Sequence, residues 1–298
     1  MQFLFLLELI WPGCSQEEIN SRFLLFLTDG VAYMLKVGKV LKETYPNLLH
    51  VTCINHGLNR VAEEVRSSFP LVDSFLASAK RIFKKAPSRV SVFKEICPEL
   101  ALPPEAVTTR WGSWLNVVEY YAKNYEKVKQ VIEKLDASDS AAVTKAKEIM
   151  HQPKLLLDHS FLSANFTFLC APLAELEQKD ASLFNSLNIL TTVENKVNSV
   201  KEAVEKKISA KLEAVISKNP NLETIRLISS TICGEQLADE DLSKIKLSPA
   251  QLASFKYAPI TTVDAERSFS IHKSMLSDRR RCMTVEHLEM SIVSKYEL

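Results

Sequence analysis

The chain lacks cysteines paired closely in sequence. No two of them form a Cys-x-x-Cys pair, and the six cysteines stand singly at positions 14, 53, 97, 170, 233 and 282. This scatter excludes the dense disulfide framework that small secreted domains use. We therefore expect reduced thiols and an intracellular protein.

An excess of charge of one sign is also missing. Lysine and arginine number 37 against 36 aspartates and glutamates, so the formal net charge is +1. No global positive field would draw the chain onto nucleic acid or an anionic membrane. Contacts to DNA would have to come from local basic clusters, which occur between Lys80 and Arg89 and at Arg279-Arg280-Arg281. The alternative for each cluster is a solvated helix face.

Nor is there an apolar run long enough to span a membrane. Residues 1–10 are apolar, but they carry Glu8, lack a basic segment in front and fall short of the roughly 20 residues that a spanning helix needs. A buried helix or strand fits them better than a signal peptide or an anchor, and we expect no membrane association. With 298 residues and 46% hydrophobic content, the chain is long enough for one large domain or two smaller ones.

The first 60 residues have the pattern of a β-α-β unit. Continuous apolar runs at 23–28 and 48–53 flank a segment that places Met34, Val37 and Leu41 on one helical face. Continuous apolarity is typical of strands covered on both faces, as in a parallel sheet. Asp29, directly after the first run, is therefore predicted at the carboxyl edge of that sheet, where α/β proteins place their chemistry.

The rest of the chain has mostly helical periodicity. One apolar stripe runs from Trp114 to Leu135, and a second runs from Leu183 to Val215. The second stripe is so long that we expect one extended helix, or two nearly collinear ones, ended by Asn219-Pro220-Asn221. Strand-forming runs are absent from about 112 to 255, which indicates a large helical region.

Four short elements in fixed order resemble the hAT superfamily of DNA transposases, named for hobo, Activator and Tam3. They are Leu-Thr-Asp-Gly at 27–30, Cys-x-x-His-Gly-Leu-Asn at 53–59, Arg110-Trp111, and Ala-Glu-Arg-Ser-Phe-Ser at 265–270. Each is weak alone. Their order, with a helical region before the last, is fairly specific, and the resemblance covers nearly the whole chain.

The resemblance implies an α/β fold that is predominantly helical overall, with a partial ribonuclease H-like core interrupted by a large all-helical insertion. In these terms residues 1–111 form the partial core and residues 112–255 the helical insertion. Residues 256–298 form a C-terminal dimerisation region of the hAT type that completes the core.

In that family three acidic residues hold two Mg²⁺ or Mn²⁺ ions for DNA cleavage and strand transfer. Two metals about 4 Å apart stabilise the attacking and leaving oxygens of an in-line displacement, and hard cations prefer carboxylate oxygen. Asp29 resembles the family's second aspartate and Glu266 its glutamate. This chain begins inside the helix that follows the strand bearing the first aspartate. We therefore expect that acid, and the N-terminal BED-type zinc finger, to be missing.

The predicted site is accordingly a relic pair of acids, Asp29 and Glu266, in an incomplete DDE-type transposase that is not an enzyme. No cofactor is expected, and Mg²⁺ or Mn²⁺ would bind at this pair only if the site were active. Both acids also have structural interpretations. Asp29 could cap the following helix by accepting from backbone N–H groups, and Glu266 could be a first-turn acid that the helix macrodipole favours.

Two further motif pairs have structural or binding interpretations. Cys53 and His56 have half of a zinc-site spacing with no second pair at a usable distance, so we favour a structural role in the core over metal binding. In the family the tryptophan corresponding to Trp111 stacks on a displaced base, which makes Arg110 and Trp111 candidates for nucleic-acid binding. Trp111 could equally cap the core below Trp114.

The functional expectation is a transposase-derived pseudoenzyme, of transposable-element origin, that dimerises and binds DNA weakly. Its partners would be a second copy or a related transposase subunit, and possibly DNA, in the nucleus or alternatively the cytoplasm. A second hypothesis is an active, divalent-metal-dependent DNA transposase or nuclease whose missing acid comes from a partner or from an unrecognised residue. A third is a protein-interaction module built on the long helices between residues 181 and 217.

Overall fold

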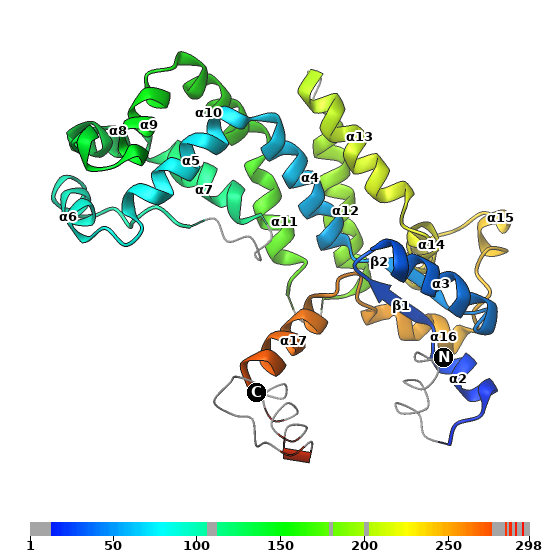
Figure 1. The fold of residues 1–298 in the computed structure, drawn as a ribbon. Helices are drawn as coiled ribbons and strands as arrows, with labels where there is room; N and C mark the ends of the chain where they lie inside the picture. Colours follow the sequence, from blue (N-terminus) through cyan, green and yellow to red (C-terminus); the bar gives the residue numbers. More distant parts are fainter. Residues whose placement is uncertain are drawn as a thin grey trace. The chain divides into compact units, whose positions relative to one another are not determined.

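The structure, a computed structural model, describes residues 13–105, 112–178, 181–199 and 203–275, together with a few positions between 284 and 294. Within this part of the chain the fold is predominantly helical, with one small sheet of two parallel strands (Figure 1). The expected helix-rich α/β class is confirmed at this level.

Two compact units emerge from the contacts along the chain. The first, here called the sheet unit, comprises Met1–Asn55, Leu176–Asn188 and Lys218–Leu298. The second, the helical unit, comprises His56–Glu175 and Ile189–Ser217. Residues 56–105 belong to the same unit as later helices, so the two units do not follow the predicted division into 1–111, 112–255 and 256–298. That division stays a prediction.

The sheet unit contains both strands and the helices near the two ends of the described chain. Its elements are α2 (Gln16–Arg22), β1 (Leu25–Thr28), α3 (Ala32–Thr44), β2 (Leu49–Thr52), α14 (Leu222–Ile232), α15 (Asp239–Leu242), α16 (Pro249–Ser254), η3 (Phe255–Tyr257) and α17 (Val263–Met275).

The helical unit is built from helices alone and includes the longest ones that the structure describes, α12, α4 and α13. Two helices cross the boundary between the units in sequence, α4 at its first residues and α12 at its middle. The elements are α4 (Ile54–Ser68), α5 (Pro70–Phe83), α6 (Pro87–Ile96), α7 (Ser113–Lys123), α8 (Tyr125–Lys134), η1 (Ala137–Asp139), α9 (Ala141–Met150), α10 (Pro153–Asn165), η2 (Thr167–Leu169), α11 (Cys170–Glu175), α12 (Leu183–Asn198) and α13 (Ala203–Ser217).

Strands β1 and β2 confirm the predicted β-α-β unit. They pair in parallel, with Leu25 opposite Leu49 and Thr28 opposite Thr52, and α3 is the crossover between them. Three of the four residues of β2 are buried and the fourth, Thr52, is partly buried, as expected for a strand covered on both faces.

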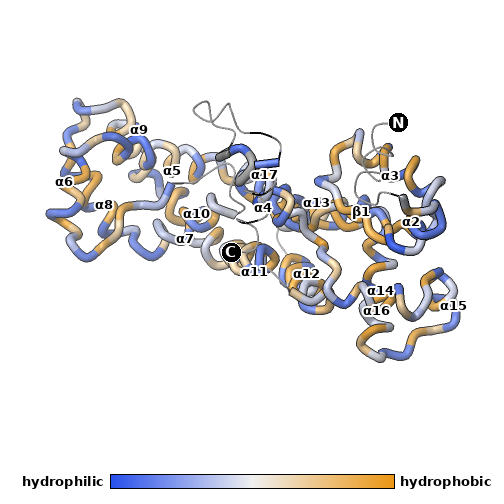
Figure 2. Tube along the Cα trace, turned by 90° about the horizontal axis from the view of Figure 1, so that it is seen from below, coloured by the Kyte–Doolittle hydropathy of each residue, from blue (hydrophilic) through white to orange (hydrophobic). Residues whose placement is uncertain are grey.

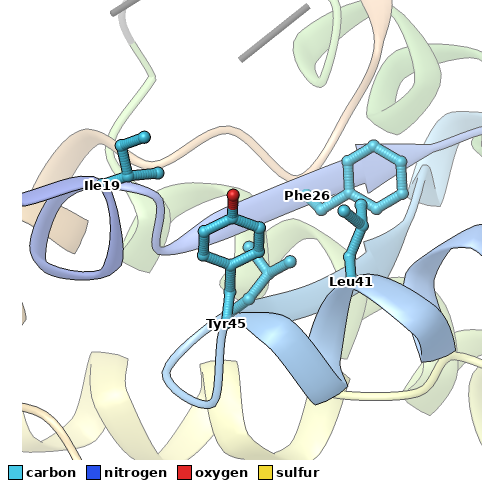
Figure 3. Close-up of a cluster of buried hydrophobic side chains, with 5 residues drawn as sticks. Ile19, Phe26, Leu41 and Tyr45 are labelled. Carbon is cyan, nitrogen blue, oxygen red and sulfur yellow. The ribbon is translucent and has the colours of Figure 1, made fainter. Parts of the chain in front are cut away.

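A small apolar cluster anchors α2 and α3 to the sheet. Ile19, Phe26, Leu41, Tyr45 and Leu48 bury their side chains together (Figure 3). The entry into α2 is fixed by a capping box between Ser15 and Glu18, in which each side chain bonds the other residue's backbone N–H. Burial of these side chains against α3 holds β1 in register for the turn that follows it.

Helix α3 approaches β2 closely at Gly38. A Cβ atom built on Gly38 would lie 2.1 Å from Nδ1 of His50, so only glycine leaves room for the imidazole. His50 is buried, and its Nε2 lies 2.9 Å from Oγ1 of Thr28 on the neighbouring strand. The His50 ring therefore lies in contact with both α3 and the end of β1.

In the helical unit, helix starts coincide with prolines. Pro70, Pro87 and Pro153 occupy the first turns of α5, α6 and α10, where a missing N–H costs no hydrogen bond. Hydrophobic and hydrophilic residues alternate along the helices, as the tube in Figure 2 shows. The apolar faces meet in a core that includes Phe75 against Tyr121, with ring centroids 5.4 Å apart in an edge-to-face arrangement.

Two helical expectations need correction. The stripe from Trp114 to Leu135 is divided at Asn124 into α7 and α8. The prediction of one extended helix, or two collinear ones, from 183 to 215 is wrong. Asn198 accepts a hydrogen bond from Ser209 at 2.6 Å, although 11 residues of straight helix would span about 16 Å. The chain therefore reverses direction between α12 and α13, which brings Ser209 back beside Asn198.

Candidate functional site

Asp29 lies where the sequence predicts it, directly after β1. Its half-buried carboxylate accepts a hydrogen bond from the N–H of Val31 through Oδ1 at 3.3 Å. The N-cap of α3 is Val31 rather than Asp29, so the aspartate closes the turn into the helix instead of capping it. Gly30 has a φ of +75° in this turn, and a Cβ there would approach the Thr52 side chain to 3.2 Å.

Glu266 lies in the first turn of α17. Its Oε1 accepts from the hydroxyl of Thr262 at 3.2 Å, and its backbone N–H donates to Thr262 O at 3.0 Å. Thr262, directly before the helix, thus holds both the backbone and the side chain of this glutamate. A carboxylate in this position is also favoured by the positive end of the helix dipole.

Hydrogen bonds connect these two acids to one edge of the sheet. The N–H of Cys53 donates to Thr28 O at 2.7 Å, and Cys53 Sγ accepts from the N–H of Thr262 at 3.2 Å. The N–H of Ile54 donates to Ile260 O at 3.0 Å. The carboxyl ends of both strands are thereby joined to the segment that starts α17, so Asp29 and Glu266 belong to the same edge.

Arg267 provides a second attachment of helix α17 to the rest of the sheet unit. The guanidinium donates to the carboxylate of Asp264 at 3.0 Å and to Glu177 O at 2.5 Å. The hydroxyl of Thr261 adds a bond to Leu176 O at 3.3 Å. The arginine that follows Glu266 in the sequence therefore has a structural function, which is to attach the helix to residues 176–177.

Cys53 is a buried structural residue, with 2% of its surface exposed. Its sulfur acts as the acceptor that links β2 to residue 262. His56 is half-buried in the first turn of α4. Across the described residues, no three histidine, cysteine, aspartate or glutamate side chains are grouped so as to hold a metal ion.

Arg110 and Trp111 lie outside the described residues, as does the cluster Arg279-Arg280-Arg281. The adjoining Gly112 is the N-cap of α7 and has a φ of +61°. Beside it, a small cavity of about 70 Å³ is lined by Asn59, Glu63, Arg66 and Trp114 among others. Asp73 accepts from both Arg66 and the indole N–H of Trp114, at 2.7 and 2.9 Å, which fixes this wall.

The basic cluster from Lys80 to Arg89 is partly neutralised. Glu105 contacts both Lys80 and Lys84, at 3.1 and 3.2 Å, and these two lysines lower the pKa of its carboxyl group by hydrogen bonding. Arg89 donates through Nε to Ile82 O. A solvated and internally paired helix end explains these residues better than a dedicated phosphate surface.

His50 was not among the residues predicted for the site. Its ring, between β2 and α3, is bonded to Thr28, one residue before Asp29. Burial lowers its pKa, so the neutral imidazole is favoured in the folded protein. A histidine within the apolar run 48–53 was the available signal, but the sequence alone does not show which residue faces it.

No family model matches the chain, and no curated protein matches it either. Of the helices in the described ranges, none combines the length and apolarity that crossing a bilayer requires.

Proposed function

We propose that the chain is a hAT transposase-derived protein that keeps part of a ribonuclease H-like core but has lost strand transfer. Its function is then dimerisation together with weak binding of DNA in the nucleus. The observation that supports this proposal is the joining of Asp29 and Glu266 to one sheet edge through Thr28, Cys53 and Thr262. Three of the four resembling elements contribute residues to that arrangement.

Catalysis is absent in this proposal because two carboxylates do not hold two metal ions. Paired Mg²⁺ or Mn²⁺ ions require bridging and charge balance from additional oxygen ligands. Asp29 Oδ1 is used in the turn to Val31, and Glu266 Oε1 is bonded to Thr262. Both acids then serve to connect elements of the sheet unit.

Calorimetric titration with Mn²⁺ at neutral pH tests this part of the proposal. We expect no saturable heat for the natural chain. Asp29→Asn keeps the acceptor for the Val31 N–H but removes the charge, so it should titrate like the natural chain. Asp139→Asn, at an exposed position in the helical unit, is the matched control. Saturable Mn²⁺ binding that Asp29→Asn removes would favour the active enzyme instead.

Dimerisation is proposed through the C-terminal region. Phe269, on α17, is 73% exposed, and Tyr257, in the preceding η3, is 62% exposed. Large apolar side chains at such exposure are typical of contact surfaces when they occur together. Light scattering of the natural chain should give twice the chain mass, and Phe269→Ser should shift it to the single-chain mass while Phe184→Ser does not.

Weak DNA binding is tested by gel shift at two salt concentrations. Phosphate contacts release counterions, so the affinity should fall steeply as salt rises and should not depend on sequence. A complex whose affinity is insensitive to salt, or the absence of a complex at low salt, would remove DNA binding from the proposed function.

A further inference from the structure

A second cavity lies in the sheet unit, at the end of the sheet away from Asp29. It has a volume of about 200 Å³ and is bounded by the end of α3, the start of β2, the first turn of α14 and residues 244–247. Because parallel strands point the same way, Leu49 at the start of β2 and Asp29 after the end of β1 are at opposite edges. The cavity is therefore separate from the sheet edge to which Asp29 and Glu266 belong.

Lysines dominate the charge of its wall. Lys42, Lys244 and Lys246 line the cavity, and no carboxylate does. Asp241 forms an ion pair with Lys244 at 2.7 Å, and the nearby Glu223 and Glu240 also act on that lysine. The cationic character that the cavity offers to a ligand therefore rests on Lys42 and Lys246.

The positive charges of these two lysines repel each other, and Lys42 is also partly buried. Lys42 donates to Leu48 O at 2.7 Å, which fixes its ammonium beside the cavity. Its pKa is lowered, first by burial and then by the positive charge of Lys246. An anion between two such ammonium groups would relieve their repulsion and favour the charged form of Lys42.

Polar and apolar groups complete the wall. Asn221 uses Oδ1 to accept from the N–H of His50 at 2.8 Å, so its carboxamide is held in one orientation with Nδ2 as a donor. Thr224 lies one turn further along α14 and adds a hydroxyl. Leu49, buried to 6% exposure, supplies an apolar floor, and low polarity there strengthens charge-assisted hydrogen bonds above it.

We propose that this cavity is a binding site for a phosphate group, held by Lys42 and Lys246 with the Asn221 amide and the Thr224 hydroxyl. Its volume suffices, since roughly 10–15 Å³ of such space already holds a water molecule. The group could belong to a small phosphorylated molecule or to a DNA backbone. The site does not depend on the proposed transposase ancestry.

Competitive acetylation of lysines, read by mass spectrometry on the intact folded chain, tests the site directly. Inorganic phosphate, compared with sodium chloride at equal ionic strength, should protect Lys42 and Lys246. Lys39, exposed on the same helix and outside the cavity, is the internal control. Equal acetylation of Lys42 and Lys246 with and without phosphate would overturn the proposal.

A second arm distinguishes the two sources of the phosphate. If duplex DNA protects the same two lysines, the site binds a backbone phosphate, and if only inorganic phosphate does, it binds a small molecule. Lys246→Met should weaken phosphate binding about tenfold, as expected for one charge-assisted hydrogen bond, while Lys39→Met should leave it unchanged. Unaltered phosphate affinity in Lys246→Met contradicts the assignment. DNA binding that persists without protection of these lysines separates this site from the proposed function.

Discussion

The carboxamide of Asn219 pairs with both backbone groups of Thr52. The N–H of Thr52 donates to Oδ1 at 2.9 Å, and Nδ2 donates back to Thr52 O at 2.9 Å. Asn221 makes a similar contact by accepting from the N–H of His50. The segment Asn219-Pro220-Asn221 thus covers the edge of β2 that faces away from β1, and blunts a surface that would otherwise invite pairing with another chain.

Replacing Asn219 tests the importance of this edge. Asn219→Ala removes two hydrogen bonds and leaves backbone groups of Thr52 without them, so we expect a loss of about 1–3 kcal/mol in the free energy of unfolding. Urea denaturation measures the change. Asn185→Ala, at an exposed position of α12, should be neutral or slightly stabilising, since alanine favours helix.

The isosteric variant Asn219→Asp keeps the shape of the side chain but replaces its hydrogen-bond donor, Nδ2, with an oxygen. It keeps the acceptor for the Thr52 N–H but places a second acceptor against Thr52 O. We expect Asn219→Asp to be destabilised at neutral pH and to recover partly in acid, where the protonated carboxyl can donate. An unfolding free energy equal to that of the natural chain at both pH values would contradict the pairing.

Gly38 should not tolerate alanine. Alanine normally stabilises a helix interior by up to about 1 kcal/mol over glycine, but here its Cβ would lie 2.1 Å from the His50 ring. Overpacking of this kind costs about 1–3 kcal/mol, so Gly38→Ala should lower the unfolding free energy. In a His50→Ala background the same change should become neutral or stabilising, and a double-mutant cycle from urea denaturation measures that coupling.

Gly57 gives an independent test in the helical unit. A Cβ at this position of α4 would come within 2.5 Å of Cγ1 of Val215 on α13. Gly57→Ala should therefore destabilise the protein by about 1–3 kcal/mol, and Val215→Ala should relieve most of that loss. If Gly57→Ala raised the unfolding free energy on its own, the close approach of α4 and α13 would be wrong.

The sequence predicted the sheet unit's strands well because their signals are local. Unbroken apolar runs and the amphipathic segment between them determine β1, α3 and β2 with little help from the rest of the chain. The site was only partly predictable. Asp29 and Glu266 could be proposed individually, whereas their connection runs through a sulfur and a threonine 209 residues apart, at Cys53 and Thr262.

The sequence could not show which residues contact each other when they are far apart along the chain. Asn219 and Asn221 read as a helix stop, yet their side chains complete a strand edge 167 and 171 residues earlier. Gly57 belongs to an element of the hAT resemblance, but its contact with Val215 gives it a packing role. Apolar periodicity also led us to predict α12 and α13 as one long helix or two collinear ones, because the spacing of apolar residues does not show where the chain reverses direction.

Two buried histidines make stability depend on pH. Burial lowers the pKa of both His50 and His159, and Nε2 of His159 donates to Val118 O. Below the ordinary pKa of 6.5 the unfolded chain binds protons that the folded chain does not. The unfolding free energy should therefore be constant above that pH and fall as the pH drops below it, until the folded pKa is reached.

Urea denaturation across about pH 8 to about pH 5 measures this loss. His159→Gln keeps a donor for Val118 O and should remove part of the loss in acid. His151→Gln, at an exposed position, is the matched control and should retain the full loss. A stability profile that stays flat through pH 6.5 in the natural chain would show that these histidines are not buried in the neutral form.

The most direct test of the proposed loss of catalysis is a nicking and end-joining assay on duplex DNA with Mn²⁺, using the natural chain and Asp29→Asn. We expect that neither protein nicks or joins DNA, with or without the metal. Mn²⁺-dependent nicking by the natural chain that disappears in Asp29→Asn and persists in Asp139→Asn would contradict it.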